Sequence, residues 1–308
     1  MKSSAEAPCK AIITGEHFVV HGAWALVAAL ERKVRVDVEA SDRFRIRSDR
    51  RGITRAALAP AERVVETMAR EFSFRPNLRI EINSEVPDGA GLGSSASTMV
   101  ALVSAISRLK SLGLGRREVI EFAMVGEREV HGHPSGIDVN ICALGGVLLF
   151  RMGARPRQVR LSRPAKLLLV QSGVRRRTRR LIDRVAATKS RYPAMFGGLA
   201  RSASEVSRLA ADRLADGDME GLGRLLTFNH AVLSSIGASN DRLDGLVDLL
   251  LSMGCRGAKL TGAGGGGSVL ALAPEGKEKS TISALERRGF EAFEAKIPVG
   301  GARSWLRP

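Results

Sequence analysis

The stretch Pro87-Asp88-Gly89-Ala90-Gly91-Leu92-Gly93-Ser94-Ser95-Ala96-Ser97 carries three alternating glycines and then several hydroxyl side chains. Glycines let the backbone turn tightly and approach a ligand closely. The apolar residues that follow recur at helical spacing: Met99, Leu102, Val103, Ile106 and Leu109. A helix start presents free N–H groups and a positive dipole end to an anion. The stretch therefore favours a phosphate site, with a serine-capped glycine turn as the alternative.

The surrounding pattern predicts that this loop is entered from a strand, because Leu78, Ile80 and Ile82 alternate with polar residues. The loop is not a Walker A loop, since no GxxxxGK[ST] occurs. The same reasoning predicts further strands at 12–13, 18–20, 34–38, 44–46, 147–150, 167–170 and 269–273. It predicts helices at 61–72, 117–131, 199–214, 219–233, 243–253 and 283–288, and a helix running through Leu181 and Val185.

Composition indicates a globular protein of one large domain or two ordinary ones, with 308 residues of which 44% are hydrophobic. No apolar run reaches the roughly 18 residues of a membrane span, and the first nine residues lack the apolar core of a signal peptide. Three widely spaced cysteines argue against a disulfide framework or zinc cluster. We therefore expect a soluble cytoplasmic protein.

The net charge of +16 raises nucleic acid as a partner. Five arginines lie within residues 175–180. Elsewhere the arginines are scattered, and aromatic residues are only 4% of the chain, which leaves little material for base stacking. We expect no nucleic-acid partner, and a nucleic-acid-binding protein stays the alternative class.

Two isolated carboxylates stand out. Glu127 falls on the apolar stripe of the helix at 117–131, where a carboxylate is costly unless it has a partner. A metal or active-site role is favoured over a salt bridge to an arginine. Asp138 follows the tight loop Gly132-His133-Pro134-Ser135-Gly136-Ile137 and could also be a helix N-cap. Glu16 and His17 lie at a glycine turn, which is either a site or a hairpin tip.

A second glycine loop, Lys259-Leu260-Thr261-Gly262-Ala263-Gly264-Gly265-Gly266-Gly267, formally satisfies GxGxxG. A strand-like run follows it, whereas dinucleotide binding needs a helix there. The loop therefore suits close packing against another backbone or a ligand. A polar, basic segment at 151–163 indicates a domain boundary.

Phosphoryl transfer needs a phosphate cradle, oxygen ligands for Mg²⁺, a group that orients the nucleophile, and a cation. The chain resembles the GHMP kinases in three ordered motifs: Pro8-Cys9-Lys10, residues 87–96 and residues 259–267. The resemblance implies an α+β fold, with a ribosomal-S5-domain-2-like ATP-binding domain at 1–160 and a ferredoxin-like domain at 161–308. Within that family the chain is most similar to the mevalonate kinases, through Gly15-Glu16-His17-Phe18-Val19-Val20-His21-Gly22, Gly126-Glu127-Arg128 and residues 131–138.

The resemblance implies ATP-dependent phosphorylation of mevalonate at its 5-hydroxyl, in isoprenoid biosynthesis. Asp138 would be the catalytic carboxylate, and Lys10 would keep it ionised and polarise the hydroxyl. Ser95 and Glu127 would hold Mg²⁺. The substrate side would be formed by Glu16, His17, His21, Thr178 and Gly264, the last closing over the γ-phosphate. The ATP phosphates would be wrapped by Pro87, Asp88, Gly89, Ala90, Gly91, Leu92, Gly93, Ser94, Ser95, Ala96 and Ser97.

The chain departs from the family in three ways. Cys9 replaces the usual glycine, the long insertions of eukaryotic members are missing as in archaeal ones, and the arginine excess has no family counterpart. One hypothesis pairs Arg151 or Arg176 with the substrate carboxylate. Family members are often dimers, so we expect a homodimer. The enzyme alternatives are sister kinases acting on phosphomevalonate, homoserine or the 3-hydroxyl of mevalonate.

Overall fold

A computed structural model of the chain describes residues 2–50, 53–86, 90–174, 178–297 and 299–307. Within these residues a seven-stranded sheet has the order β11-β1-β2-β4-β3, with β5 paired to β2 and β6 to β5. Of the strand pairs described in this sheet, only β3 and β4 run parallel. The strands are β1 (Lys2–Thr14), β2 (Ala25–Ala40), β3 (Arg45–Ser48), β4 (Leu78–Ser84), β5 (Val147–Phe150), β6 (Arg157–Gln158) and β11 (Arg303–Arg307).

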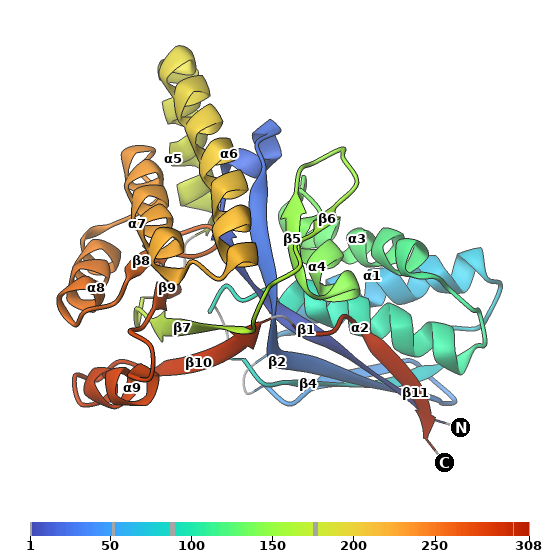
Figure 1. Cartoon of the computed structure of the whole chain (residues 1–308). Coiled ribbons are helices and arrows are strands. Elements are labelled where there is room, and N and C mark those ends of the chain that lie inside the picture. The colour runs from blue at the N-terminus through green and yellow to red at the C-terminus, as the bar shows by residue number, and fades with distance from the viewer. Residues whose placement is uncertain (1, 51–52, 87–89, 175–177, 298, 308) are drawn as a thin grey trace.

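Four helices lie beside this sheet in Figure 1: α1 (Arg55–Glu71), α2 (Ser94–Leu109), α3 (Arg116–His131) and α4 (Ile137–Leu144). The central one is α2, which packs against β1, β2, α3, α4 and β11. Most of its residues are buried, including the polar Ser97, Ser104 and Ser107, because strands and helices surround it. The helix that begins at the glycine stretch is thus held from all directions, which fixes the position of its N-terminus.

The second sheet is antiparallel, in the order β10-β7-β9-β8: β10 (Ala292–Ile297), β7 (Ala165–Gln171), β9 (Ser268–Leu272) and β8 (Gly257–Leu260). In chain order this is fourth-first-third-second, the arrangement of a ferredoxin-like sheet. It confirms the predicted α+β fold class. The helices of this half are α5 (Thr178–Arg191), α6 (Pro193–Asp216), α7 (Met219–Ser235), α8 (Asp241–Ser252) and α9 (Glu278–Glu286).

The strand β1 is much longer than the sequence predicted, because its polar residues are satisfied by neighbouring strands. Glu6 accepts hydrogen bonds from Lys33 of β2, at 2.8 Å, and from Arg303 of β11, at 2.9 Å. Burial opposes ionisation of Glu6, but these two cations outweigh it and hold its pKa below the usual value. The C-terminal strand therefore closes the first sheet, and the two chain ends lie together in Figure 1.

The predicted strand at 18–20 is wrong: Phe18–His21 forms the short 3₁₀ helix η1. Gly15 has φ +92°, and a Cβ there would lie 2.6 Å from the Cα of Ala25, so the chain turns sharply against β2. Phe18 instead packs on Phe196 of α6, with ring centroids 5.3 Å apart. A short apolar run cannot by itself distinguish these conformations.

The last helix also begins earlier than predicted, at Glu278. Across the described residues no helix is long and apolar enough to span a bilayer.

Close approach of α7 and β8 depends on paired glycines, which generates a stability prediction. A Cβ on Gly257 would lie 1.9 Å from the carbonyl oxygen of Gly223. We expect Gly257→Ala to lower the free energy of unfolding by about 1–3 kcal/mol through overpacking. Gly245→Ala is the control, since Gly245 is helical with open space around it, and it should add about 0.5–1 kcal/mol. Urea unfolding measures both; equal effects would contradict the steric argument.

Candidate active site

Lys10 and Asp138 meet at the centre of the site. Lys10 Nζ lies 3.1 Å from Asp138 Oδ1. Lys10 is buried in β1, where the register with β2 shifts, and its backbone N–H donates to the carbonyl of Leu92 at 2.8 Å. A Cβ on Gly93 would lie 2.6 Å from Lys10 Cγ, so this glycine makes room for the lysine side chain. The glycine loop is therefore packed directly on the lysine.

Asp138 is not a helix N-cap, because Gly136 caps α4 and Asp138 lies inside its first turn. Its side chain is 28% exposed. The buried Oδ1 atom receives no hydrogen bond from the described residues, since Lys10 is close but not aligned for one. The exposed part of this carboxylate, beside a cation, can accept a hydrogen bond or a proton, which suits a group that contacts a substrate hydroxyl.

Glu127 and Ser95 form the second pair, in which the Ser95 hydroxyl donates to Glu127 Oε1 at 2.6 Å. Glu127 is 3% exposed, and His131 Nε2 lies 3.7 Å from its other oxygen. Burial raises the pKa of Glu127, and the nearby negative charge of Asp138 raises it further. No arginine is paired with Glu127 among the described residues, so the structure does not favour the salt-bridge alternative.

Close packing of two helices brings this pair together. A Cβ on Gly126 would lie 2.5 Å from the sulfur of Met99, so Gly126 lets α3 approach α2. Ser95 lies in the first turn of α2 and Glu127 near the end of α3. Glycine at 126 thus allows an acidic side chain on a core-facing stripe to reach the hydroxyl at the helix start.

The loop residues have different surroundings. Ser94 accepts a hydrogen bond from Arg50 at 2.5 Å, whereas Ser97 is fully buried and donates to the carbonyl of Pro8 at 2.8 Å. Ala90, Leu92 and Ala96 are buried. Pro87, Asp88 and Gly89 lie outside the described residues.

The residues predicted on the substrate side are only partly accessible. Glu16 is buried, and its carboxylate is bound by Lys259 and by Asn229 Nδ2 at 3.2 Å. His17 contacts the carbonyl of Ala263 at 2.8 Å, next to Gly264. His21 is exposed, with Lys189 Nζ 3.3 Å from its Nδ1. Burial lowers the pKa of His21, and the Lys189 charge adds to that effect.

The remaining predicted residues lie around these. Gly264 has φ +77°, and a Cβ on it would lie 2.1 Å from the carbonyl oxygen of Ala238. The second loop therefore packs closely on another backbone, as predicted, and a strand rather than a helix follows it. Thr178 begins α5, but its side chain and Arg176 lie outside the described residues. Arg151 lies over the ring of Trp24, 5.9 Å from its centroid.

Sequence reasoning missed the role of Lys259, which it recorded only as the start of a motif. Lys259 is fully buried and forms an ion pair with Glu16. It also donates to the carbonyl of Leu260 at 2.5 Å. Burial lowers its pKa, and the negative charge of Glu16 opposes that change. The available signal was a single lysine within an apolar strand, which is costly unless paired.

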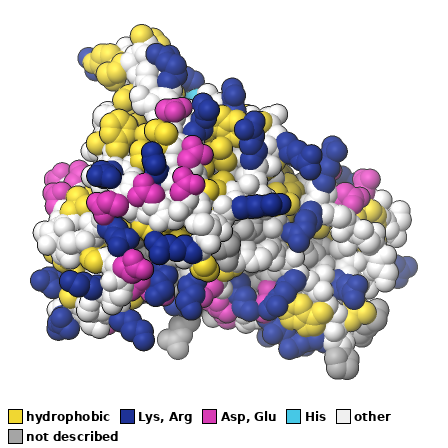
Figure 2. Space-filling model, in the orientation of Figure 1, with side chains coloured by type: hydrophobic (Ala, Val, Ile, Leu, Met, Phe, Trp, Pro, Cys, Tyr) yellow, Lys and Arg dark blue, Asp and Glu magenta, His cyan; other side chains and the backbone are white. Residues whose placement is uncertain are grey.

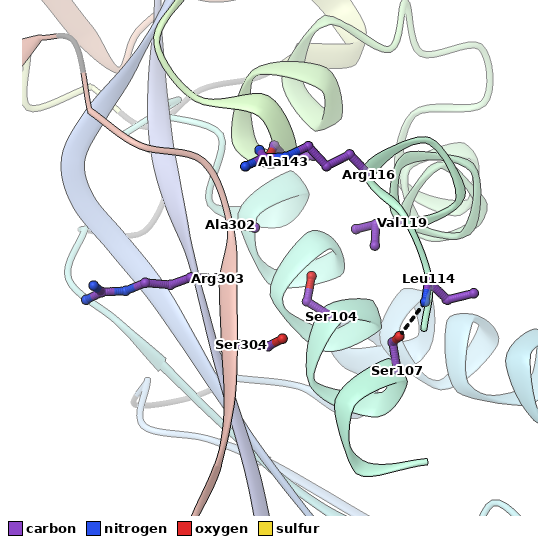
Figure 3. Close-up of a pocket in the computed structure, with 9 residues that line it drawn as sticks. All are labelled: Ser104, Ser107, Leu114, Arg116, Val119, Ala143, Ala302, Arg303 and Ser304. Carbon is purple, nitrogen blue, oxygen red and sulfur yellow. Dashed lines mark hydrogen bonds between the residues drawn. The ribbon is translucent and has the colours of Figure 1, made fainter. Parts of the chain in front are cut away.

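A separate cavity of about 130 Å³, drawn in Figure 3, lies away from these residues between α2, α3 and β11. Its polar side chains are used within the protein. Arg116 donates to the carbonyl of Ala143 at 2.6 Å, and Ser107 accepts from the N–H of Leu114 at 3.2 Å. Arg303 points away from it in Figure 3 and binds Glu6. This cavity is therefore not the candidate active site.

The basic side chains are spread over the face drawn in Figure 2, where they alternate with acidic ones. They form no single basic stripe on that face. The distribution gives no support there for a nucleic-acid groove.

Comparisons of the sequence and of the fold with known proteins agree on one family. The family described as GHMP kinases N terminal domain matches residues 59–146, and GHMP kinases C terminal matches residues 210–292. A mevalonate kinase of Aeropyrum pernix is 38% identical, covering 97% of each chain. A mevalonate kinase of Methanothermobacter thermautotrophicus is 33% identical, over 98% of this chain and 99% of its own. The structure of L. major mevalonate kinase in complex with R-mevalonate has a TM-score of 0.83 and 26% identity, covering 96% of each chain.

The buried ion pair generates the prediction for this site. Lys259→Met leaves the Glu16 carboxylate buried without its cation, so we expect a loss of about 3–5 kcal/mol in the free energy of unfolding. The double variant Lys259→Met/Glu16→Gln removes both charges and should recover part of that loss. Arg117→Met is the control, because Arg117 and Glu121 form an exposed pair that should contribute at most about 1 kcal/mol. Losses that simply add in the double variant would show that the two charges are not coupled.

Proposed function

The chain belongs to the GHMP kinase family, with the mevalonate kinases, and from this we propose that it transfers the γ-phosphoryl group of ATP to the 5-hydroxyl of (R)-mevalonate. The products are 5-phosphomevalonate and ADP, a step of isoprenoid biosynthesis by the mevalonate pathway. The observation that carries this proposal is the Lys10–Asp138 ion pair beside the buried Ser95–Glu127 pair.

Asp138 and Lys10 act on the attacking hydroxyl in this proposal. Asp138, whose side chain is 28% exposed, receives a hydrogen bond from the 5-hydroxyl and takes its proton as the bond to phosphorus forms. Lys10 Nζ counters the negative charge that develops on the hydroxyl oxygen and the transferred phosphoryl group. Burial of Lys10 strengthens that interaction, because water screens it less.

Ser95 and Glu127 are the proposed Mg²⁺ ligands. Mg²⁺ prefers hard oxygen donors and is commonly held by one or two carboxylates together with substrate phosphates. A hydroxyl at a helix start and a buried carboxylate without a lysine or arginine partner among the described residues fit that need. The ion would neutralise charge on the ATP phosphates. Glu127 favours a cation here, since its charged form is otherwise poorly solvated.

The two glycine loops are the proposed phosphate site, with residues 87–97 wrapping the ATP phosphates and Gly264 closing over the γ-phosphate. Ser268, just after the second loop, donates to the carbonyl of Ala90 at 2.8 Å, so the loops are joined. His17, His21 and Thr178 are proposed to face mevalonate. Glu16 is buried and is proposed to act indirectly, through its ion pair with Lys259. Arg151 or Arg176 remains the proposed partner of the mevalonate carboxylate. The division into domains at residue 160 remains a prediction, as do the homodimer and the cytoplasmic location.

The substrate assignment is tested by ADP release from the purified protein with ATP and Mg²⁺, measured in parallel with mevalonate, phosphomevalonate and homoserine. We expect turnover with mevalonate and phosphorylation at its 5-hydroxyl, identified in the product by NMR. Turnover with phosphomevalonate or homoserine alone, or a product phosphorylated at the 3-hydroxyl, would contradict the assignment and indicate one of the sister kinases.

The role of Asp138 is tested separately. Asp138→Asn keeps the shape of the side chain but cannot accept the proton as a carboxylate does. We expect kcat to fall by about 10²–10⁴-fold, with ATP binding retained in calorimetry. Glu129→Gln is the control, because Glu129 lies on the exposed face of α3 and its loss should leave kcat unchanged. Near-normal turnover by the Asp138→Asn variant would refute the proton-accepting role.

A further inference from the structure

Ser97 is the last residue of the first glycine stretch, yet its side chain is completely buried, with 0% exposure. A buried hydroxyl needs partners within the protein. Ser97 Oγ lies within hydrogen-bond reach of the carbonyls of Pro8 and Gly93 and of the sulfurs of Cys9 and Cys142. These partners come from β1, from the loop before α2 and from α4. The hydroxyl therefore stands where the three segments meet.

On the strand side, Ser97 holds the backbone next to Lys10. Its hydroxyl donates to the carbonyl of Pro8, two residues before Lys10, at 2.8 Å. The register between β1 and β2 shifts between Pro8 and Lys10, so the regular ladder is interrupted at this point. The N–H of Lys10 donates to the carbonyl of Leu92 at 2.8 Å. These two bonds attach the backbone of residues 8–10 to the start of α2.

On the helix side, Ser97 contacts the helix that carries Asp138. Cys142 Sγ lies 3.3 Å from Ser97 Oγ. Cys142 follows Asp138 by four residues on α4, which places the two about one turn apart along the same side of the helix. Burial raises the pKa of the Cys142 thiol, so the thiol keeps its hydrogen. Because a hydroxyl has a single hydrogen and Ser97 gives it to a carbonyl, the thiol is the donor in this contact.

The bond from Ser97 to the strand sets it apart from other serines of α2. A serine inside a helix commonly donates to the carbonyl four residues before it. Ser104 does so, with its hydroxyl 2.7 Å from the carbonyl oxygen of Val100. Ser97 has the same option in Gly93, at 3.0 Å, but the carbonyl of Pro8, outside the helix, is closer. Ser97 therefore links elements that Ser104 does not.

We propose that Ser97 is a positioning residue, whose hydroxyl joins the strand that carries Lys10 to the helix that carries Asp138 and so sets the separation of these two charged groups. Lys10 Nζ and Asp138 Oδ1 are 3.1 Å apart, and α2 packs against both of the elements that carry them. Catalytic groups work only within about 0.5 Å of their productive geometry. The proposal rests on the proposed function, in which this pair acts on the attacking hydroxyl.

The test removes the hydroxyl and measures both the geometry and the activity. In crystal structures of wild type and Ser97→Ala, we expect the distance between Lys10 Nζ and Asp138 Oδ1 to be longer in the variant. We expect kcat to fall by about 10–100-fold, since a displacement of about 1 Å can cost that much. KM for ATP and KM for mevalonate should change little, because Ser97 contacts neither ligand. Ser104→Ala is the control: it removes the same group from the same helix, and should leave the distance and kcat unchanged.

A second variant separates positioning from stability. Ser97→Thr keeps the hydroxyl but adds a methyl group to a packed interior, so we expect a lower midpoint of thermal unfolding through overpacking while most of kcat is retained. A purely structural role predicts instead that kcat follows stability in both variants.

An unchanged distance in Ser97→Ala would overturn the proposal, whether or not kcat falls. So would a kcat that falls as far in Ser97→Thr as in Ser97→Ala. A raised KM for ATP with unchanged kcat would also overturn it, because Ser97 would then contact the nucleotide. If wild type does not phosphorylate mevalonate, the proposed function fails, while the distance measured in the crystals still decides the role of Ser97.

Discussion

The ion pair between Lys259 and Glu16 is the interaction on which the site depends. Both side chains are almost completely buried, and a buried charge is tolerated only when it is paired and hydrogen-bonded. Glu16 follows β1, which carries Lys10, while Lys259 lies in β8, which leads into the second glycine loop. Asn229 and the carbonyl of Leu260 satisfy further polar capacity of the pair. The strand of the first sheet and the loop of the second half are thus joined by two buried charges that neutralise each other.

Further bonds converge on the same junction. Thr261 Oγ1 donates to the carbonyl of Ile12 at 2.9 Å, and Ser268 Oγ donates to the carbonyl of Ala90 at 2.8 Å. The second loop can follow this path only with glycine at 264, since the carbonyl of Ala238 occupies the space of a side chain. The segment of the second loop is therefore held on two backbone acceptors of the first half, Ile12 and Ala90, and the first loop supplies one of them. This explains how motifs separated by about half the chain come to lie side by side.

Much of this arrangement could be predicted from the sequence, where local patterns carry the signal. The helix after residue 93 was predicted from the spacing of its apolar residues. Glu127 was recognised because a carboxylate on the core-facing stripe of a helix is costly unless it has a partner. The length of β1 could not be predicted, because Glu6 is stabilised by Lys33 and Arg303, which are distant in sequence. The η1 turn was missed because an apolar run fits a strand as well as a turn that packs on a distant helix, here α6. The ion pair of Lys259 was missed for the same reason as those of Glu6, because its partner is distant in sequence.

The two acidic residues differ in surroundings in a way that divides the proposed chemistry between them. Lys10 lies against Asp138, so the charge of Asp138 is balanced by the protein itself and its exposed side can meet a substrate. Glu127 has a serine hydroxyl and a more distant histidine near it, and burial raises its pKa. A buried carboxylate that lacks a strong cation weakens the folded state by itself. Such a position is better explained by a cation that arrives with the nucleotide than by stability, because the bound cation would offset the cost of the buried charge.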